Sequence, residues 1–265
     1  MTNKQILQAD LTKLPNHNSH VDWLLLVCDD EGNILIEETC PQSDVNSDWV
    51  VSQLKTLQSL PQAMQVFRPQ AVGLLQTAAE QLGITVETTR RTLALKDILQ
   101  QRGVNIDLEQ LPPQPLPENL WGEQWRFVSL SAGDVFEAFQ GQPIPIQEMP
   151  ASLNPLKFGI ASNTPIPGIL IYGGRQSMPL AQWLLTAQPY AVTYIPTEAG
   201  KSGGLVLESG LCDRWILATF EDETVAQAAE SYQQRFWASQ GIHFLVIEPD
   251  DSGMTRTAVW LLKKE

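Results

Sequence analysis

The first third of the chain alternates short apolar runs with segments of helical period. Residues 22–40 form two apolar runs around Asp29–Asn33, a pattern typical of a β-hairpin in which Gly32 and Asn33 take positive φ angles. Apolar residues recur at helical spacing in three later segments, and strand-like runs separate them. The expected elements are a helix (46–60) with Asn46 or Ser47 as its N-cap, a strand (62–67), a helix (69–83), a strand (84–89) and a helix (91–103). This order predicts an α/β domain whose later strands are parallel.

The periodic pattern stops at residues 108–120, where four prolines occur in thirteen residues. Proline fixes φ and lacks an N–H, so such a segment is stiff and excludes regular structure. We therefore predict a Pro-rich linker here. It would join an N-terminal α/β domain (1–107) to a C-terminal α/β domain (121–265).

The second half of the chain shows the same alternation. The expected elements are a strand (125–130), a helix capped by Ser131 (131–141), a Pro-rich excursion (142–155), a strand (168–173), a helix (177–188), a strand (190–195), paired runs (204–209 and 213–220), a long helix (223–241) and a last pair of runs (243–248 and 255–262). The fold class is therefore α/β, with two mixed-sheet domains, the N-terminal one loosely ribonuclease-H-like. Residues 64–89 and 169–195 share the order strand, basic residue, helix, strand, which leaves an internal duplication open.

Charge and composition narrow the function classes. The formal net charge is −13, so the molecule as a whole repels nucleic acid and anionic membranes, and any RNA contact needs a local basic patch. Three cysteines (Cys28, Cys40 and Cys212) have no metal-type spacing, which indicates a reduced, cytoplasmic protein. The first residues have no leader-like character, and no apolar run approaches membrane-span length. We expect a soluble protein without membrane insertion.

Gly200-Lys201-Ser202 is the first candidate for chemistry. A phosphate loop needs glycine five residues before Gly-Lys and a helix directly after it, whereas Ile195 stands upstream and a strand-like run follows. A nucleoside triphosphate site is therefore excluded. Lys201 remains a candidate contact for a single phosphate, because glycine-rich backbone lets a ligand approach closely.

Acidic residues of the first hairpin raise the alternative of a two-metal nuclease. Asp29, Asp30, Glu37 and Glu38 lie there, and strand-borne carboxylates are typical Mg²⁺ ligands. Ordinary turn chemistry explains Asp29 and Asp30 equally well and is the favoured interpretation. No serine or cysteine hydrolase signature occurs. A metal nuclease built on Asp29 and Glu37 stays open as the third hypothesis.

RNA binding requires basic residues interleaved with aromatic ones. Residues 90–102 carry Arg90, Arg91, Lys96 and Arg102 against the single acid Asp97, a local charge of +3. Further basic residues lie at the ends of expected elements: Arg68, Arg175, Lys201 and Arg214. Eight tryptophans are many for this length, and Trp121 and Trp125 flank the linker. A solvated helix face and core packing remain open as the simpler explanations.

Four long blocks, in order, resemble the Tab/Atab family of plastids and cyanobacteria. They are WLLLVCDDEGNILIEETCP, QVFRPQAVGLLQTAAEQLGITVETTRRTLAL, GKSGGLVLESGLCDRWILATFEDE and GIHFLVIEPDDSGMTRTAVWLL. The resemblance implies an RNA-binding protein that supports translation of photosystem messages, notably that of a photosystem I reaction-centre subunit, and photosystem accumulation. It also implies separate N- and C-terminal family domains, no catalysis and no cofactor.

Three short motifs of the family have counterparts in this chain. Trp260-Leu261-Leu262 corresponds to the family's near-terminal Trp-Leu-Leu, and the blocks at 200–204 and 213–215 also match. One departure lies at residues 8–12, where Asp10 is kept but the aromatic residues usual in the family are missing. The predicted RNA contacts are Arg68, Arg90, Arg91, Lys201, Arg214, Trp215 and Trp260. The alternative function is a protein–protein assembly factor for photosystem biogenesis that meets RNA only indirectly.

Overall fold

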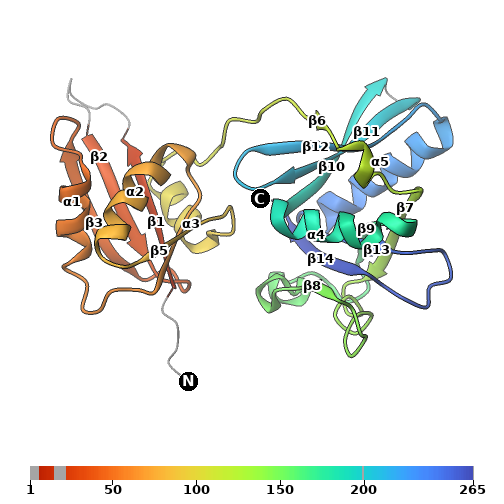
Figure 1. The fold of residues 1–265 in the computed structure, drawn as a ribbon, viewed down its shortest axis with the longest axis horizontal. Helices are drawn as coiled ribbons and strands as arrows, with labels where there is room; N and C mark the ends of the chain where they lie inside the picture. Colours follow the sequence, from red (N-terminus) through yellow and green to blue (C-terminus); the bar gives the residue numbers. More distant parts are fainter. Residues whose placement is uncertain (1–5, 15–21, 199, 265) are drawn as a thin grey trace. The chain divides into compact units, whose positions relative to one another are not determined.

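The computed structural model describes residues 6–14, 22–198 and 200–264. The chain divides into two compact units, which we call the N-terminal unit (1–109) and the C-terminal unit (110–265) (Figure 1). Both combine mixed β-sheets with helices, which confirms the predicted α/β class. Among the described residues, no helix is both long and apolar enough to cross a bilayer.

The N-terminal unit is a five-stranded sheet between two layers of helices. In spatial order its strands are β3 (Ile34–Pro41), β2 (Asp22–Cys28), β1 (Ile6–Lys13), β4 (Ala63–Val66) and β5 (Thr85–Thr88). The first three run antiparallel, and β1, β4 and β5 are parallel. Helices α1 (Ser47–Leu54) and α2 (Pro69–Gln81) pack on one face, and α3 (Leu93–Gln101) packs on the other.

Local signals define these helices well. The Asn46 side chain accepts a hydrogen bond from the Trp49 N–H and so begins α1, as predicted, although α1 ends at Leu54 rather than near residue 60. Pro69 occupies the first turn of α2. In the first hairpin, Gly32 has a φ of 88°, but Asn33 does not have a positive φ, so that part of the turn prediction is wrong. Asn33 instead donates its backbone N–H to Asp29 Oδ1.

The central strand β1 is absent from the sequence-based prediction. It has a clear period of two: Leu7, Ala9 and Leu11 join the core under α1 and α2, whereas the alternate side chains are polar and face α3. Those polar side chains, Gln8, Asp10 and Thr12, are also buried. Gln8 Oε1 accepts the Leu95 N–H at the start of α3, which stabilises the helix terminus.

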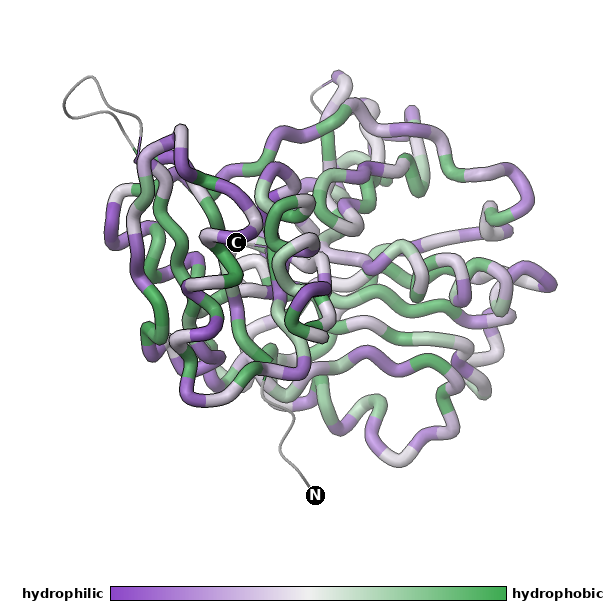
Figure 2. Tube along the Cα trace, turned by 60° about the vertical axis from the view of Figure 1, so that its left-hand side comes forward, coloured by the Kyte–Doolittle hydropathy of each residue, from purple (hydrophilic) through white to green (hydrophobic). Residues whose placement is uncertain are grey.

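The C-terminal unit contains two sheets. One has the order β10 (Pro189–Glu198), β11 (Ser202–Ser209), β12 (Asp213–Phe220) and β6 (Gln114–Pro115). The other has the order β7 (Gln124–Ser131), β9 (Pro165–Tyr172), β13 (Ile242–Glu248), β14 (Ala258–Lys263) and β8 (Ile146–Glu148). The main core of the unit combines residues of both sheets with α4 (Ser177–Ala187) and α5 (Glu223–Ala238). Figure 2 shows the hydrophobic segments concentrated in the strands.

Two predictions for this unit are corrected. Residues 132–141 form successive turns rather than a helix. The N–H groups of Asp134 and Phe139 bond three residues back and those of Ala138 and Gln140 four residues back, so no continuous helical ladder forms. Ser131, the predicted N-cap, is the last residue of β7. The Pro-rich excursion contains a short strand, β8, paired with β14. Internal duplication finds no support: β4 and β5 are neighbours in one sheet, whereas β9 and β10 belong to different sheets.

Part of the predicted Pro-rich linker packs on the C-terminal unit. Its strand β6 pairs in parallel with β12, and Leu116 and Leu120 are buried in the main core. A two-residue edge strand tolerates proline because its missing N–H costs no ladder hydrogen bond. The short 3₁₀ helix η1 (Glu118–Leu120) then leads into β7.

Candidate nucleic-acid interface

Basic residues gather at one edge of the N-terminal sheet. Lys13 ends β1, Arg68 comes two residues after β4, and Arg90 and Arg91 come shortly after β5. Because these three strands are parallel and adjacent, their carboxyl ends meet at the same edge. We call Lys13, Arg68, Arg90 and Arg91 the carboxyl edge. The structure therefore brings together three residues that the sequence predicts as RNA contacts.

Arg68 is anchored inside this edge. Its Nε lies 3.0 Å from Asp10 Oδ2, and its Nη2 donates to the Asn105 carbonyl at 3.0 Å. The Arg68 side chain is 13% exposed and that of Asp10 is fully buried. Burial raises the pKa of Asp10, and the neighbouring Arg68 charge opposes that rise. Arg68 thus stabilises the fold and offers only a small surface to a ligand.

The predicted basic cluster at 90–102 is mostly not a solvated face. Arg90 and Lys96 are buried, and Lys96 Nζ donates to the Arg90 carbonyl at 2.7 Å while lying over the Phe67 ring. Arg102 forms a two-pronged ion pair with Glu37 on β3. Arg91 is the exposed arginine of the cluster. A solvated helix face therefore explains little of this basic sequence.

An open pocket of about 520 Å³ lies at the carboxyl edge. Its wall contains Lys13, Arg68 and the backbone turn at 103–105. The Lys13 side chain is exposed. Lys13 is not among the predicted RNA contacts, because its position at the end of β1 follows only from a strand that was not predicted. The alternation of Leu7, Ala9 and Leu11 with polar residues is the signal that identifies the strand.

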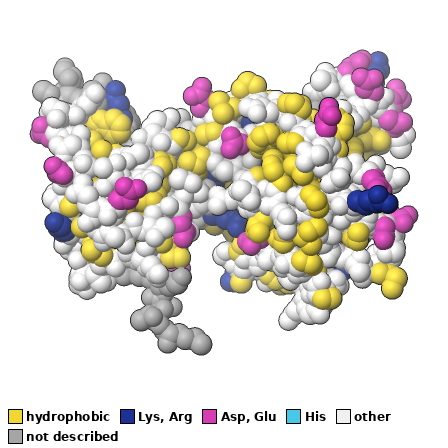
Figure 3. Space-filling view, viewed as in Figure 1, with side chains coloured by type: hydrophobic (Ala, Val, Ile, Leu, Met, Phe, Trp, Pro, Cys, Tyr) yellow, Lys and Arg dark blue, Asp and Glu magenta, His cyan; other side chains and the backbone are white. Residues whose placement is uncertain are grey.

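Part of the negative charge of the N-terminal unit lies away from this edge, in the β2–β3 turn that carries Asp29, Asp30 and Glu31. Asp22 and the end of β3 lie at the same end of the sheet as Lys13, because Lys13 pairs with Trp23 and Asp22 pairs with Pro41. Residues 22–48, which form β2, β3 and the start of α1, contain eight Asp and Glu and no Lys or Arg. In the sheet, β3 is the outermost strand on the side opposite β5. The unit has eight Lys and Arg against 14 Asp and Glu, a net charge of −6, but this charge is unevenly distributed. Acidic side chains are spread over the face drawn in Figure 3, so only a local patch can attract RNA.

The nuclease alternative does not survive the structure. Asp29 accepts hydrogen bonds from the Asn33 side chain and from the backbone of the turn, which lower its pKa. Both carboxylate oxygens of Glu37 accept hydrogen bonds from the Arg102 guanidinium. Within the described ranges, no group of three or more His, Cys, Asp or Glu residues is placed to hold a metal ion. The hairpin acids are turn and ion-pair residues.

In the C-terminal unit, the predicted cations Lys201 and Arg214 lie far apart. Lys201 is in the turn between β10 and β11 and pairs with Glu198 at 2.8 Å, with both side chains exposed. Arg214 lies opposite Glu208, near the other end of β11, and donates to the Leu111 carbonyl. Seven strand residues separate the two ends, which corresponds to about 23 Å. They cannot hold one phosphate together.

The two predicted aromatic contacts are packed against the interior. Trp260 is 1% exposed in the main core, so it anchors the core and is not a stacking surface for RNA. Trp215 is half-buried, donates its Nε1–H to Ser209 Oγ and meets the Trp183 ring edge-on at 5.2 Å. Core packing therefore explains both rings.

Matches to known families decide the identity. A model of the RNA-binding protein Tab2/Atab2 N-terminal region matches residues 6–102, and a model of the Tab2/Atab2 C-terminal domain matches residues 104–263. The chain belongs to the Tab2/Atab2 family. Its relatives include the chloroplastic TAB2 homologue of Arabidopsis thaliana, 28% identical over 91% of this chain and 69% of that protein. The Zea mays homologue is 24% identical over 91% of this chain and 66% of its own length.

Solved structures give only remote likenesses. The catalytic domain of Mos1 mariner transposase is 14% identical with a TM-score of 0.29, over 38% of this chain and 59% of that one. The catalytic core of BIV integrase is 13% identical with a TM-score of 0.28, over 38% and 65%. At these scores the likeness carries no argument, and the ribonuclease-H-like character of the N-terminal unit remains weak.

The motifs on which the predicted family resemblance rests occupy structural positions in this chain. Trp260-Leu261-Leu262 lies inside β14, and all three side chains are buried. The Gly-Lys-Ser-Gly-Gly block spans the turn into β11, and Asp213-Arg214-Trp215 begins β12. Asp10 is the buried partner of Arg68.

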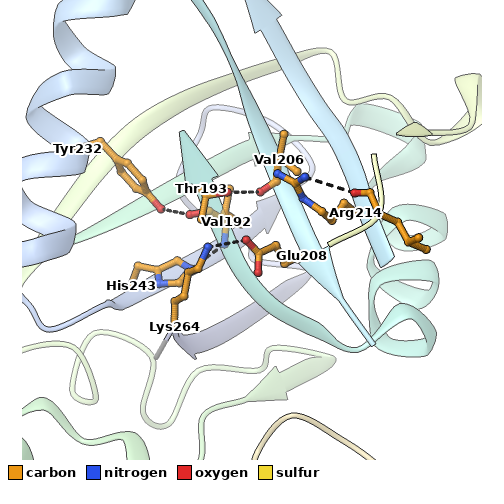
Figure 4. Close-up of polar contacts among 9 residues, drawn as sticks. Val192, Thr193, Val206, Glu208, Arg214, Tyr232, His243 and Lys264 are labelled. Atoms are coloured by element: carbon orange, nitrogen blue, oxygen red, sulfur yellow. Dashed lines mark hydrogen bonds and ion pairs between the residues drawn. The ribbon is translucent and has the colours of Figure 1, made fainter. Parts of the chain in front are cut away.

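A buried polar network closes the edge of the four-stranded sheet of this Tab2/Atab2 protein (Figure 4). Among the described strands, β10 pairs with β11 alone. The Val192 N–H donates to His243 Nε2 at 2.8 Å, and the Val192 carbonyl accepts the Tyr232 hydroxyl at 2.8 Å. Since Nε2 is the acceptor, the His243 proton is on Nδ1, which donates to the Gly241 carbonyl. His243 therefore satisfies a strand edge and is no catalytic base.

This arrangement predicts acid sensitivity. Burial lowers the pKa of His243 from 6.5 to about 4; Lys264 adds to the decrease, and the Gly241 carbonyl and Glu208 oppose it. The unfolded chain takes up the proton below about pH 6.5, whereas the folded chain does so only near pH 4. The contribution of neutral His243 to the free energy of unfolding is therefore complete above about pH 6.5. It decreases by about 3 kcal/mol as the pH falls toward 4.

Urea unfolding at pH 7.5 and pH 4.5 measures this loss. His243→Gln is the matched control, because its side chain can accept the Val192 N–H without titrating. The wild type should lose more free energy of unfolding than the variant between the two pH values. Equal losses would assign the acid sensitivity to other groups.

Proposed function

We propose that this Tab2/Atab2 protein binds RNA directly, through the carboxyl edge of its N-terminal unit. It supports translation of photosystem messages, notably that of a photosystem I reaction-centre subunit, in the cytoplasm and without catalysis. Membership of a family of RNA-binding proteins supports the RNA contact. The observation that carries the site is the convergence of Lys13, Arg68, Arg90 and Arg91 at the ends of three parallel strands.

Charge distribution explains how a protein of net charge −13 can attract a polyanion. Asp29, Asp30 and Glu31 of the β2–β3 turn lie at the opposite end of the sheet from the carboxyl edge, so they oppose the field of Lys13 and Arg91 less than nearby acids do. Lys13 and Arg91 are exposed and can reach phosphates. Arg68 is paired with Asp10 and Arg90 is buried, so these two residues contribute mainly to the shape of the edge.

We expect Arg91→Ala to weaken RNA binding and to flatten its dependence on salt. Loss of one phosphate contact on a single strand reduces the slope of log affinity against log salt by about 0.7. A Lys13→Ala/Arg91→Ala double variant should lose about twice that slope. The measurement is a titration with the leader of a photosystem message at about 50, 100 and 200 mM salt.

Lys55→Ala is the matched control for this titration. Lys55 is an exposed cation of the same unit, at the end of α1 on the opposite face of the sheet from α3. The Lys55→Ala substitution removes one positive charge, as Arg91→Ala does. A general electrostatic effect would therefore weaken RNA binding equally in both variants. Binding by the wild type with no difference between Arg91→Ala and Lys55→Ala would reject the carboxyl edge. No binding by the wild type at any salt would reject direct RNA recognition.

A further inference from the structure

The C-terminal unit contains a half-open cavity of about 450 Å³. The segment from β6 to the start of β7 forms one wall, and residues of β9, α4, β11 and β12 form the others. Most lining side chains are apolar, including Leu116, Leu120, Ile171, Leu205 and Ala218. The volume lies in the range of pockets that hold small organic groups. None of the functional assignments above uses this cavity.

Trp121 lies at this cavity with an unusual combination of properties. It is 59% exposed, yet its Nε1–H donates to the Leu116 carbonyl at 2.8 Å. The next residue, Gly122, lies so close to β9 that a Cβ there would meet Ile171 Cγ2 at 2.5 Å. The indole is therefore held in one place while much of its surface stays open. A tryptophan that is fixed but uncovered is a preformed stacking surface.

A second ring and several polar groups complete the cavity. Trp125 also lines it, half-buried and 5.3 Å from the Phe127 ring in an edge-on contact. The polar lining groups are Glu123, Gln124 and Thr219. A Cβ on Gly174 would clash with the Glu123 carboxylate, so this carboxylate lies against the turn that contains the exposed Arg175.

We propose that this cavity binds one unstacked base of single-stranded RNA. The proposal rests on the proposed function and adds a subsite to it. A nucleobase is flat, uncharged and largely apolar on its faces, which suits two indole rings and aliphatic walls. Its amino and imino N–H groups match carboxylate and amide acceptors such as Glu123 and Gln124.

Charge determines which part of the nucleotide enters. Glu123 repels phosphate, so the sugar–phosphate backbone remains outside the cavity. Arg175 is exposed and follows Gly174, which lies against the cavity residue Glu123, so the proposal assigns it to the flanking phosphate. The expected preference is for bases that carry an amino group, and uracil should bind least well.

Trp121→Ala tests the proposal in the same RNA titration. Removing a stacking ring should weaken leader binding about 5- to 100-fold. The salt slope should be unchanged, because no phosphate contact is removed, and Trp121→Phe should recover much of the affinity. Trp237→Ala is the matched control, since Trp237 is 67% exposed and does not line the cavity. Circular dichroism confirms folding of each variant.

The outcomes separate the two hypotheses. The base pocket and the carboxyl edge are both supported if Trp121→Ala binds RNA more weakly with an unchanged salt slope and Arg91→Ala has a flatter salt slope. Wild-type affinity in Trp121→Ala, with Arg91→Ala still impaired, overturns the base pocket and leaves the proposed function in place. Equal losses in Trp121→Ala and Trp237→Ala also overturn the pocket. A wild type that binds no RNA overturns both.

Discussion

Replacing Trp260 with alanine is expected to lower the free energy of unfolding of the C-terminal unit by about 3–5 kcal/mol. Trp260 is 1% exposed and is the largest of the fully buried side chains. It projects from β14, opposite Leu245 on β13, into the core that joins both sheets. Truncation to alanine removes the burial of a large apolar surface and leaves a cavity that close packing cannot fill completely.

Trp237→Ala makes a matched comparison within the same unit. Trp237 is 67% exposed on α5, so its loss should change stability by less than about 0.5 kcal/mol. Urea midpoints of the two variants give the difference directly. A stable Trp260→Ala variant that no longer binds RNA would contradict the structural role and restore a stacking role for this ring.

Replacing Asp10 with alanine should destabilise the N-terminal unit by about 3 kcal/mol. The change leaves the Arg68 guanidinium largely buried beside an apolar methyl group, with the Asn105 carbonyl as a remaining acceptor. Breaking a buried pair from one side costs much more than the pair contributes, because the remaining charge stays desolvated. Glu198→Ala, which breaks the exposed Lys201 pair, is the control and should cost less than about 1 kcal/mol.

The reverse variant, Arg68→Met, should show a distinct pH dependence. Without Arg68, the buried Asp10 carboxyl can take up a proton, which removes the charge that is costly to bury. Arg68→Met should therefore be less destabilised at pH 5 than at pH 8, whereas Asp10→Ala should show no such relief. A double-mutant cycle over both positions gives the coupling energy. A coupling near zero would show that the two side chains act independently.

These two predictions concern residues whose roles the sequence alone does not reveal. Arg68 and Trp260 are both predicted RNA contacts, one as a basic residue at a strand end and one as a ring in a family motif. In the fold, Arg68 bonds to Asp10, which is 58 residues away in the chain, and Trp260 lies between two sheets. Arg91 keeps the exposure that an RNA contact requires.

The sequence by itself determined the local elements and the family. The hairpin, the period of α2 and α5 and the Asn46 cap depend on residues within a few positions of one another, so their signals are visible in a single segment. The four family blocks likewise need no structure to be recognised. The alternation of apolar and polar residues over Ile6–Lys13 is a local signal of the same kind, although β1 is not among the predicted strands.

Tertiary structure alone decided which residues meet. Strand order brings β1, β4 and β5 together and so creates the carboxyl edge, and it sends β9 and β10 into different sheets. Residues 132–141 form turns that are tied to a loop some thirty residues later in the chain, through the N–H groups of Ala132 and Gly133. A local pattern reports the period of a segment, whereas burial, ion pairs and cavities depend on partners contributed by distant segments. The open face of Trp121 and the buried face of Trp260 therefore became distinguishable only in the fold.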